Sequence, residues 1–294
     1  MPDFTAATTT HAPVDHLRRI GLGRRTLIMG VLNATPDSFS DGGLYLDPQK
    51  AVARALEMLA EGADIIDIGG ESTRPSTFRD QSPLDPAEER RRVEPVIAAL
   101  AAQAPDAPIS IDTYKPEVAR AALDAGARVL NDVSGLGYDP AMADLAAQSG
   151  APLILMHMPG PPRALPQAPA YGDIVADLTD YFERRIVLAK ERGMRDEQIV
   201  LDPGLGFGKS AANNLEILRR LPELRALGFP ILSGPSRKSF LGALLGGAAP
   251  EQRLEGTAAA TALSIAGGAD IVRVHDVKFI AGLARVCDAI LGRA

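Results

Sequence analysis

The stretch TLIMGVLN, at residues 26–33, is the first of eight short apolar runs that together decide the fold. Each run is continuously apolar instead of alternating with polar residues, which is typical of a strand buried on both faces. Segments of helical composition follow the runs, such as AVARALEMLAEG at residues 51–62. The runs cover residues 26–33, 64–69, 109–112, 129–131, 152–157, 199–202, 230–233 and 271–275.

This count predicts a (β/α)8 TIM barrel in a single α/β domain. The chain has 294 residues, or about 37 for each of eight units, which is enough for a strand, a helix and two connections. A doubly wound open sheet would also alternate strands and helices, but the number and even spacing of the runs favour the barrel. We expect the barrel to occupy residues 26–294, after a partly disordered N-terminal lead at residues 1–25.

Composition narrows the class of protein. Hydrophobic residues make up 46% and charged residues 23%, which excludes a mainly disordered chain. The net charge of −6 argues against general nucleic-acid binding. No apolar run approaches the roughly 20 residues of a membrane span, and the first residues lack the pattern of a secretory signal, so we expect a cytoplasmic protein that does not enter membranes. Cys287 is the only cysteine, which excludes intrachain disulfides.

Polar side chains stand where the predicted strands end. Because the carboxyl ends of barrel strands converge on one face, these side chains predict an active site there. Arg273 and His275 alternate on the last run and therefore share one side of it. The other run ends carry Asn33, Asp112, Asn131, His157, Asp202 and Ser233.

Two loop motifs add to this face. LDPGLGFGKS, at residues 201–210, resembles a phosphate-binding loop, but Pro203 stands where a P-loop needs glycine, so nucleotide binding is not predicted. Its glycines instead allow Phe207 to approach a ligand closely. GPSRKSF, at residues 234–240, supplies Lys238. Asp112, Asn131, Asp202 and Lys238 together suit a flat ring with donor and acceptor edges, such as a pterin or a purine.

The loops GGESTRP, at residues 69–75, and NATPDSFSDGG, at residues 33–43, also follow predicted strands. Loops of this composition can close over a site as lids. Arg74, Arg273 and His275 offer positive charge to an anionic leaving group. Asn33 offers one oxygen ligand to a largely hydrated Mg2+.

An ordered set of motifs resembles the dihydropteroate synthase family of pterin-binding barrels. The motifs occur in the family's order from about residue 27 to the C-terminus, almost one to each strand and helix unit. They are MGVLNATPDSFSDGG, DIIDIGGESTRP, SIDTYKPEVA, VLNDVSG, LMHMPGPP, LDPGLGFGK, GPSRKSF and IVRVHDV. One departure is Ser76, which follows Pro75 where the family usually has glycine.

The resemblance implies a transferase of folate biosynthesis, the class that sulfonamides inhibit, in which 4-aminobenzoate attacks 6-hydroxymethyl-7,8-dihydropterin pyrophosphate to give 7,8-dihydropteroate and pyrophosphate. It also implies Mg2+ as cofactor, with Asn33 as ligand, and a homodimer formed through the last helices. For the pterin it implies Asp112, Asn131, Met156, Asp202, Phe207, Lys238 and Arg273. For 4-aminobenzoate it implies Phe39, Thr73, Pro75, Phe207, Lys238 and Ser239. For pyrophosphate it implies Ser72, Thr73, Arg74, Arg273 and His275.

Catalytic roles would fall to Asp37, Arg74, Lys238, Arg273 and His275, with Asp37 stabilising a cationic pterin intermediate. Two alternatives share the barrel. A pterin-dependent methyltransferase would not need the TPDSFSD and ESTRP loops or the SRKS segment. A non-catalytic pterin-binding paralogue would have lost loop or Mg2+ residues, whereas Asn33, Arg74 and His275 are all present.

Overall fold

The computed structural model describes residues 17–34, 48–72, 82–160 and 171–293, and its strands lie where the eight apolar runs predict them. At 230–233 only two residues form a regular strand, and Pro230 at the start of this run has no N–H to donate. The strands are β1 (Leu27–Asn33), β2 (Ile65–Gly69), β3 (Ile109–Asp112), β4 (Val129–Asp132), β5 (Leu153–Met156), β6 (Ile199–Asp202), β7 (Leu232–Ser233) and β8 (Ile271–Val274).

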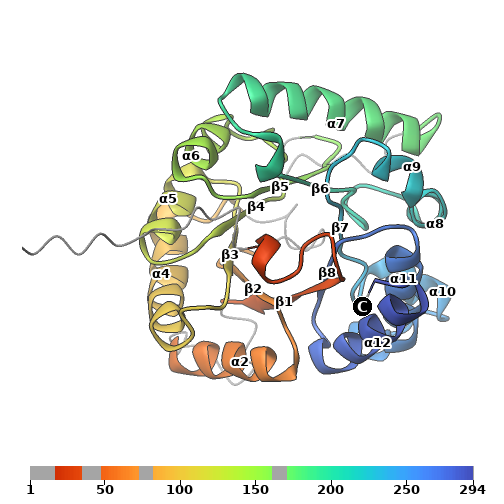
Figure 1. The fold of residues 1–294 in the computed structure, drawn as a ribbon, viewed down its shortest axis with the longest axis horizontal. Coiled ribbons are helices and arrows are strands. Elements are labelled where there is room, and N and C mark those ends of the chain that lie inside the picture. The colour runs from red at the N-terminus through yellow and green to blue at the C-terminus, as the bar shows by residue number, and fades with distance from the viewer. Residues whose placement is uncertain (1–16, 35–47, 73–81, 161–170, 294) are drawn as a thin grey trace, which may run out of the picture.

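All eight strands are parallel and form one sheet curled into a barrel, which confirms the predicted (β/α)8 fold. Their hydrogen-bonded order is β6-β5-β4-β3-β2-β1-β8-β7. A bridge between Leu201 of β6 and Ile231, just before β7, brings the two ends of the sheet together. Figure 1 shows the strands as an inner ring with the helices around them.

Several helices begin where the sequence supplies a cap or a proline. At the start of α4, Asp85 accepts hydrogen bonds from the backbone N–H groups of Ala87 and Glu88, and Asp173 caps α7 in the same way. None of the described helices is long and apolar enough to cross a bilayer. The helices are α2 (Pro48–Glu61), α4 (Pro86–Gln103), α5 (Pro116–Asp124), α6 (Ala141–Ser149), α7 (Ile174–Glu191), α8 (Ala211–Arg219), α9 (Leu221–Arg225), α10 (Ser239–Leu244), α11 (Leu254–Ala266) and α12 (Val277–Ile290).

The interior of the barrel changes from apolar to polar along the strands. Residues two apart on a strand share a face, so Val129 lies below Asn131 on β4 and Ile271 lies below Arg273 on β8. The lower layer is one apolar cluster, which we call the apolar floor. It consists of Leu27, Met29, Ile65, Val129, Ile154, Val200, Leu232 and Ile271.

Residues 17–25 pack against the apolar floor. A helical turn at 17–19 leads into further turns up to residue 24. Leu17 is only 2% exposed and belongs to the same cluster as the floor, and Ile20 and Leu22 pack against that cluster. These residues therefore cover the amino-terminal end of the barrel, opposite the predicted site. The rest of the predicted lead, residues 1–16, lies outside the described residues.

Candidate active site

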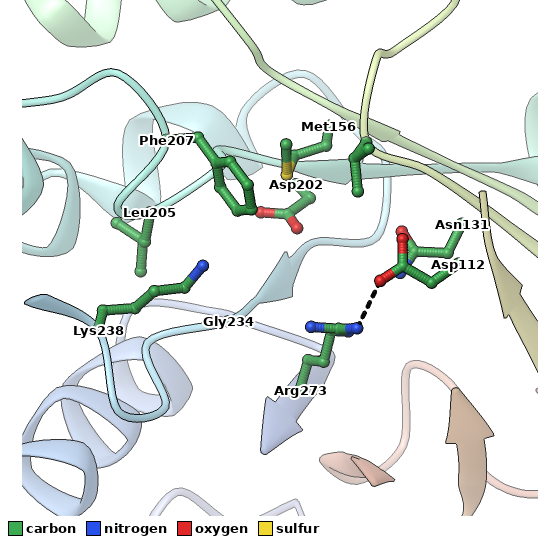
Figure 2. A pocket seen from close by; sticks show the side chains of 10 residues that line it. Asp112, Asn131, Met156, Asp202, Leu205, Phe207, Gly234, Lys238 and Arg273 are labelled. Carbon is green, nitrogen blue, oxygen red and sulfur yellow. Dashed lines mark hydrogen bonds and ion pairs between the residues drawn. The ribbon is translucent and has the colours of Figure 1, made fainter. Parts of the chain in front are cut away.

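A pocket opens at the carboxyl ends of the strands, and all seven residues predicted to bind the pterin line it. Figure 2 shows Asp112 and Asn131 facing Phe207, Met156 and Asp202 across the pocket, with Lys238 and Arg273 below them in that view. The space between these side chains, including the part open to solvent, is about 340 Å3. The full lining is Asp112, Asn131, Val133, Met156, Asp202, Leu205, Phe207, Gly234, Lys238 and Arg273.

One wall of the pocket is a buried ion-pair network centred on Arg273. Its Nε donates to Asp67 Oδ2 at 2.6 Å, and one of its terminal nitrogens donates to Asp112 Oδ2 at 2.8 Å. Asn131 Nδ2 donates to the same Asp67 oxygen at 3.0 Å. Asp67 is completely buried, so its charge is stabilised mainly by these two donors. The carboxylate thereby fixes the orientation of both Arg273 and Asn131.

Asp112 is the least satisfied charged group of this wall. Its Oδ1 is buried and has no hydrogen-bond partner among the described residues. Burial raises the pKa of Asp112 to about 7; the neighbouring charges of Asp67 and Glu89 act in the same direction, while Arg273 and Lys238 oppose the rise. A ligand that donates a hydrogen bond to Oδ1 would therefore remove a desolvation penalty and favour the ionised carboxylate.

The opposite wall combines a carboxylate, a cation and an aromatic ring. Asp202 Oδ1 accepts a hydrogen bond from the Gly204 N–H at 2.7 Å, and burial raises the pKa of Asp202. Lys238 Nζ lies 4.0 Å from the centre of the Phe207 ring. Burial lowers the pKa of Lys238 to about 8, and the like charge of Arg273 contributes to this shift. The two walls thus present acceptors and donors to one enclosed space.

An apolar cluster of Tyr114, Val133, Met156, Met158 and Phe207 contributes to the pocket. Met156 is 2% exposed and Phe207 is 7% exposed, so both ligand-facing side chains are supported by neighbours. A flat ring bound between Met156 and Phe207 would make apolar contact with its faces, while its edges meet the polar side chains. The placement of a ring between these two side chains stays a prediction from the family motifs.

His275 lies just after β8, two residues beyond Arg273, and its Nδ1 is 3.0 Å from Ser236 Oγ. Burial lowers the pKa of His275 to about 3, with the charges of Arg273, Arg237 and Lys238 contributing. In the free site the imidazole is therefore neutral, and it would offer an N–H donor where the sequence predicts a cation. Its contact with pyrophosphate stays a prediction.

Three other predicted residues are described outside the pocket lining. Asn33 ends β1 and is partly exposed, and Ser72 is partly exposed in the segment after β2. Ser239 is exposed at the first position of α10. The predicted residues Asp37, Phe39, Thr73, Arg74 and Pro75 lie outside the described residues, as does most of both predicted lids.

A buried cluster fixes both flanks of the β2–α4 connection. Lys115 is 1% exposed, and its Nζ donates to Glu71 Oε2 at 2.7 Å, to Glu89 Oε2 at 2.5 Å and to the carbonyl oxygen of Leu84 at 2.7 Å. The Tyr114 hydroxyl also donates to Glu71, at 3.1 Å. Glu71 accepts in addition from the Leu84 N–H. The chain therefore leaves β2 and approaches α4 at fixed points.

Sequence reasoning missed Asp67 and Lys115. Asp67 lies within β2 and not at its end, and Lys115 follows the end of β3 after the predicted site residue Asp112. A signal was present for Asp67, because an acidic residue within a strand buried on both faces requires a buried donor. Lys115 follows β3 closely in SIDTYKPEVA, but nothing in its local sequence identifies Glu71 and Glu89 as its partners.

The fold and the site define an α/β-barrel enzyme whose pocket, at the carboxyl ends of the strands, suits a flat polar ring. Residues 29–275 match the model of the family described as "Pterin binding enzyme". The chain is 49% identical over 268 residues to the dihydropteroate synthase of Synechocystis, an alignment that covers 91% of each chain. It belongs to the dihydropteroate synthase family.

Solved structures agree with this assignment. The dihydropteroate synthase of Clostridium difficile, solved in the presence of pteroic acid, superposes with a TM-score of 0.84 at 49% identity, covering 92% of this chain and 98% of that one. The enzyme of Xanthomonas albilineans with 4-aminobenzoic acid superposes with a TM-score of 0.83 at 45% identity, covering 91% and 93%. Family membership makes this chain a transferase and confirms that part of the sequence analysis.

Proposed function

We propose that this protein joins 4-aminobenzoate to 6-hydroxymethyl-7,8-dihydropterin pyrophosphate. The amine nitrogen attacks the methylene carbon, and the C–O bond to pyrophosphate breaks with its electron pair leaving on oxygen. The amine then loses one proton to give 7,8-dihydropteroate. An arylamine is already a competent nucleophile, so the reaction depends on holding the two substrates together and on stabilising the leaving group.

The observation that carries this proposal is the pairing of acceptors and donors around one flat space. Asp112 Oδ1 is buried and lacks a donor within the described part of the chain, and Asp202 stands on the opposite wall. The amino and ring N–H groups of a pterin would supply the donors that buried carboxylates need. Lys238 and Asn131 would serve the acceptor edge of the same ring, and Met156 and Phe207 its faces.

Stabilisation of pyrophosphate is assigned to groups at the mouth of the pocket. Arg273 keeps its charge, because Asp67 and Asp112 raise its pKa against the opposing effect of burial. His275 would add an N–H donor. Ser72, Thr73 and Arg74 complete the proposed set from the segment after β2, whose flanks the Lys115 cluster fixes. Asp37 is proposed to stabilise positive charge on the pterin as the C–O bond breaks.

Mg2+ fits this site as a hydrated ion shared with the substrate. The described residues contain no group of three or more His, Cys, Asp or Glu side chains able to hold a metal. These residues alone therefore do not form a site with only protein ligands. Asn33, partly exposed at the end of β1, would supply a single oxygen ligand, as suits an ion held mainly by water and phosphate oxygens. When bound, Mg2+ would neutralise charge on the pyrophosphate.

The aminobenzoate is proposed to lie on the outer side of the pterin. Phe207 and Lys238 would contact it from the pocket, and Ser239, exposed at the start of α10, would border it. Phe39, Thr73 and Pro75 complete the proposed contacts. A sulfonamide that imitates 4-aminobenzoate would then compete for the same space.

A coupled assay tests the reaction directly. Purified protein with Mg2+, the pterin pyrophosphate and 4-aminobenzoate should release one pyrophosphate for each dihydropteroate formed. Omission of 4-aminobenzoate should suppress both products, and a sulfonamide should raise the apparent KM for 4-aminobenzoate. Tight binding of the pterin pyrophosphate without any product would contradict the reaction and favour a non-catalytic pterin-binding protein.

We further propose that the protein is a homodimer in the cytoplasm, associating through α11 and α12. Phe279, Val286 and Ile290 recur on α12 at a spacing that places them on one face, and they are 51%, 60% and 79% exposed. Leu263 on the neighbouring α11 is 61% exposed. An exposed apolar patch of this kind is typical of a protein interface.

Introducing negative charge into this patch should therefore dissociate the dimer into monomers. The double variant Val286→Asp and Ile290→Asp is expected to have half the wild-type mass by light scattering, because two carboxylates on each copy would be buried without partners. Val187→Asp provides the matched control, since Val187 is 55% exposed on α7, away from the patch. A double variant that keeps the wild-type mass would disprove this interface.

A further inference from the structure

Lys209 is a buried lysine that the proposed reaction does not use. It is 9% exposed and forms no ion pair with any of the described residues. Its Nζ donates instead to three backbone carbonyl oxygens: Gly204 at 2.9 Å, Phe207 at 3.2 Å and His157 at 3.3 Å. All three ammonium hydrogens are thereby used on backbone. Burial lowers the pKa of Lys209 to about 7, and the nearby charge of Asp202 opposes this shift.

The three carbonyls belong to two separate connections. His157 follows β5, and its own N–H donates to the carbonyl oxygen of Asp202 at the end of β6. Gly204 and Phe207 belong to the glycine-rich loop after β6. A single ammonium group therefore ties the exit of β5 to the loop that carries Phe207.

The loop depends on this tie because its backbone is tightly folded. Gly204 has a φ of 67°, and a Cβ there would lie 2.2 Å from the carbonyl oxygen of His157. The loop therefore packs directly on the β5 exit, with its carbonyl groups turned towards Nζ. The other side of the loop is held by Asn214, whose Oδ1 accepts from the Gly206 N–H at 2.7 Å. Without Lys209, the carbonyl of Phe207 would lose its buried donor, and the carbonyl of Gly204 would keep only the N–H of Phe207.

We infer that Lys209 is a positioning residue for pterin binding, which acts by holding Phe207 and the loop after Asp202 in place at the pocket. This inference rests on the proposed function, because it concerns the same ligand. The Lys209 charge also favours the ionised form of Asp202, which lies in the pocket wall. Loss of the ammonium group should thus weaken pterin binding in two ways: the contact with the Phe207 ring would be less well positioned, and the ionised form of Asp202 would be less favoured.

The test compares two buried lysines. Lys209→Met keeps the length and apolar stem of the side chain but removes the three donors, and it should weaken binding of 6-hydroxymethylpterin at least about tenfold by calorimetry. Lys115→Met is the control, because Lys115 is also buried, at 1% exposed against 9% for Lys209, and lies outside the pocket lining. The ligand 6-hydroxymethylpterin carries no pyrophosphate, so the β2–α4 connection that Lys115 holds does not enter this measurement. We expect Lys115→Met to lower thermal stability and to leave the Kd for the pterin within twofold of wild type.

A double-mutant cycle separates positioning from general destabilisation. If Lys209 acts through Phe207, the effect of Lys209→Met on the pterin Kd should shrink in a Phe207→Ala background, because the contact that Lys209 positions is already gone. Full additivity would overturn this route. Should Lys209→Met not fold, Lys209→Gln retains two N–H donors and carries the same measurements. Failure of both variants to fold would assign Lys209 to global stability and overturn the inference.

The two proposals fail in different ways. A wild-type protein that does not bind 6-hydroxymethylpterin contradicts the proposed function. A wild-type protein that binds it, together with a folded Lys209→Met variant of equal affinity, contradicts only the role of Lys209.

Discussion

Asp112→Asn should weaken pterin binding by at least about 30-fold while leaving the barrel folded. Truncating one partner of a buried, hydrogen-bonded charge pair costs roughly 2–5 kcal/mol, which corresponds to this range of affinity. The amide retains one acceptor oxygen but loses the charge that faces Arg273 and, in our proposal, the pterin N–H groups. Calorimetric titration with 6-hydroxymethylpterin measures the effect, and circular dichroism checks the fold.

A buried carboxylate far from the pocket provides the control. Asp288 is 5% exposed, and its two oxygens accept from the backbone N–H and the hydroxyl of Thr26, near the start of β1. Asp288→Asn makes the same chemical change at similar burial, so we expect lower thermal stability with unchanged pterin affinity. Equal loss of affinity in the two variants would mean that Asp112 acts through stability alone, against its assignment to the ligand.

Asp67→Asn should change both the strength and the pH dependence of pterin binding. Arg273 and Asn131 share Asp67 Oδ2 as acceptor, so loss of the charge should weaken affinity about tenfold at pH 8. In the wild type, Asp112 has a pKa of about 7. Because the ligand favours the ionised carboxylate, affinity should rise with pH up to about 7. Removing the Asp67 charge lowers the pKa of Asp112, which moves this rise to lower pH.

The groups that face Asp112 make the sign of this shift clear. Asp67 and Glu89 raise its pKa, whereas Arg273 and Lys238 lower it, so removal of the Asp67 charge should lower the pKa of Asp112 as long as Arg273 stays paired with Asp112. Titrations between pH 5.5 and 7.5 measure the midpoint. Ser110→Ala is the control, since Ser110 pairs with Asp67 in the β2–β3 register and its buried Oγ has no partner among the described residues. A midpoint that stays in place in Asp67→Asn would refute the electrostatic role.

The barrel could be predicted from the sequence because its strands are buried on both faces and so appear as continuous apolar runs. The run at 199–202 coincides with β6, and the run at 109–112 with β3. Asp112 and Asp202 could be predicted for a related reason, since parallel strands bring their carboxyl ends to one face whatever the intervening helices contain. The family motifs then added Met156, whose apolar side chain carries no polar signal of its own.

The rest of the site depends on contacts between distant segments. Asp67 and Arg273 are separated by 206 positions, and no local pattern in either strand states that they meet. The same holds for Lys209. Its three acceptors are backbone carbonyls, which every residue type has, so the sequence does not reveal them. The neutral state of His275 also follows only from its enclosure beside other cations. These features arise from tertiary packing, which depends on the whole sequence and not on any local pattern.

The apolar floor is a layer of low dielectric constant beneath the charged groups of the pocket, as well as a part of the scaffold. Five of the barrel strands change within two residues from hydrocarbon to a pocket-wall side chain or to Asp67, and Leu17 seals the far end. Because hydrocarbon does not screen charge, the fields of Arg273 and its two carboxylates are directed towards the open mouth. A floor substitution that admitted water would therefore weaken ligand discrimination without altering any residue that touches the ligand. We therefore expect the leucine, isoleucine and valine side chains beneath the pocket to contribute to substrate selectivity.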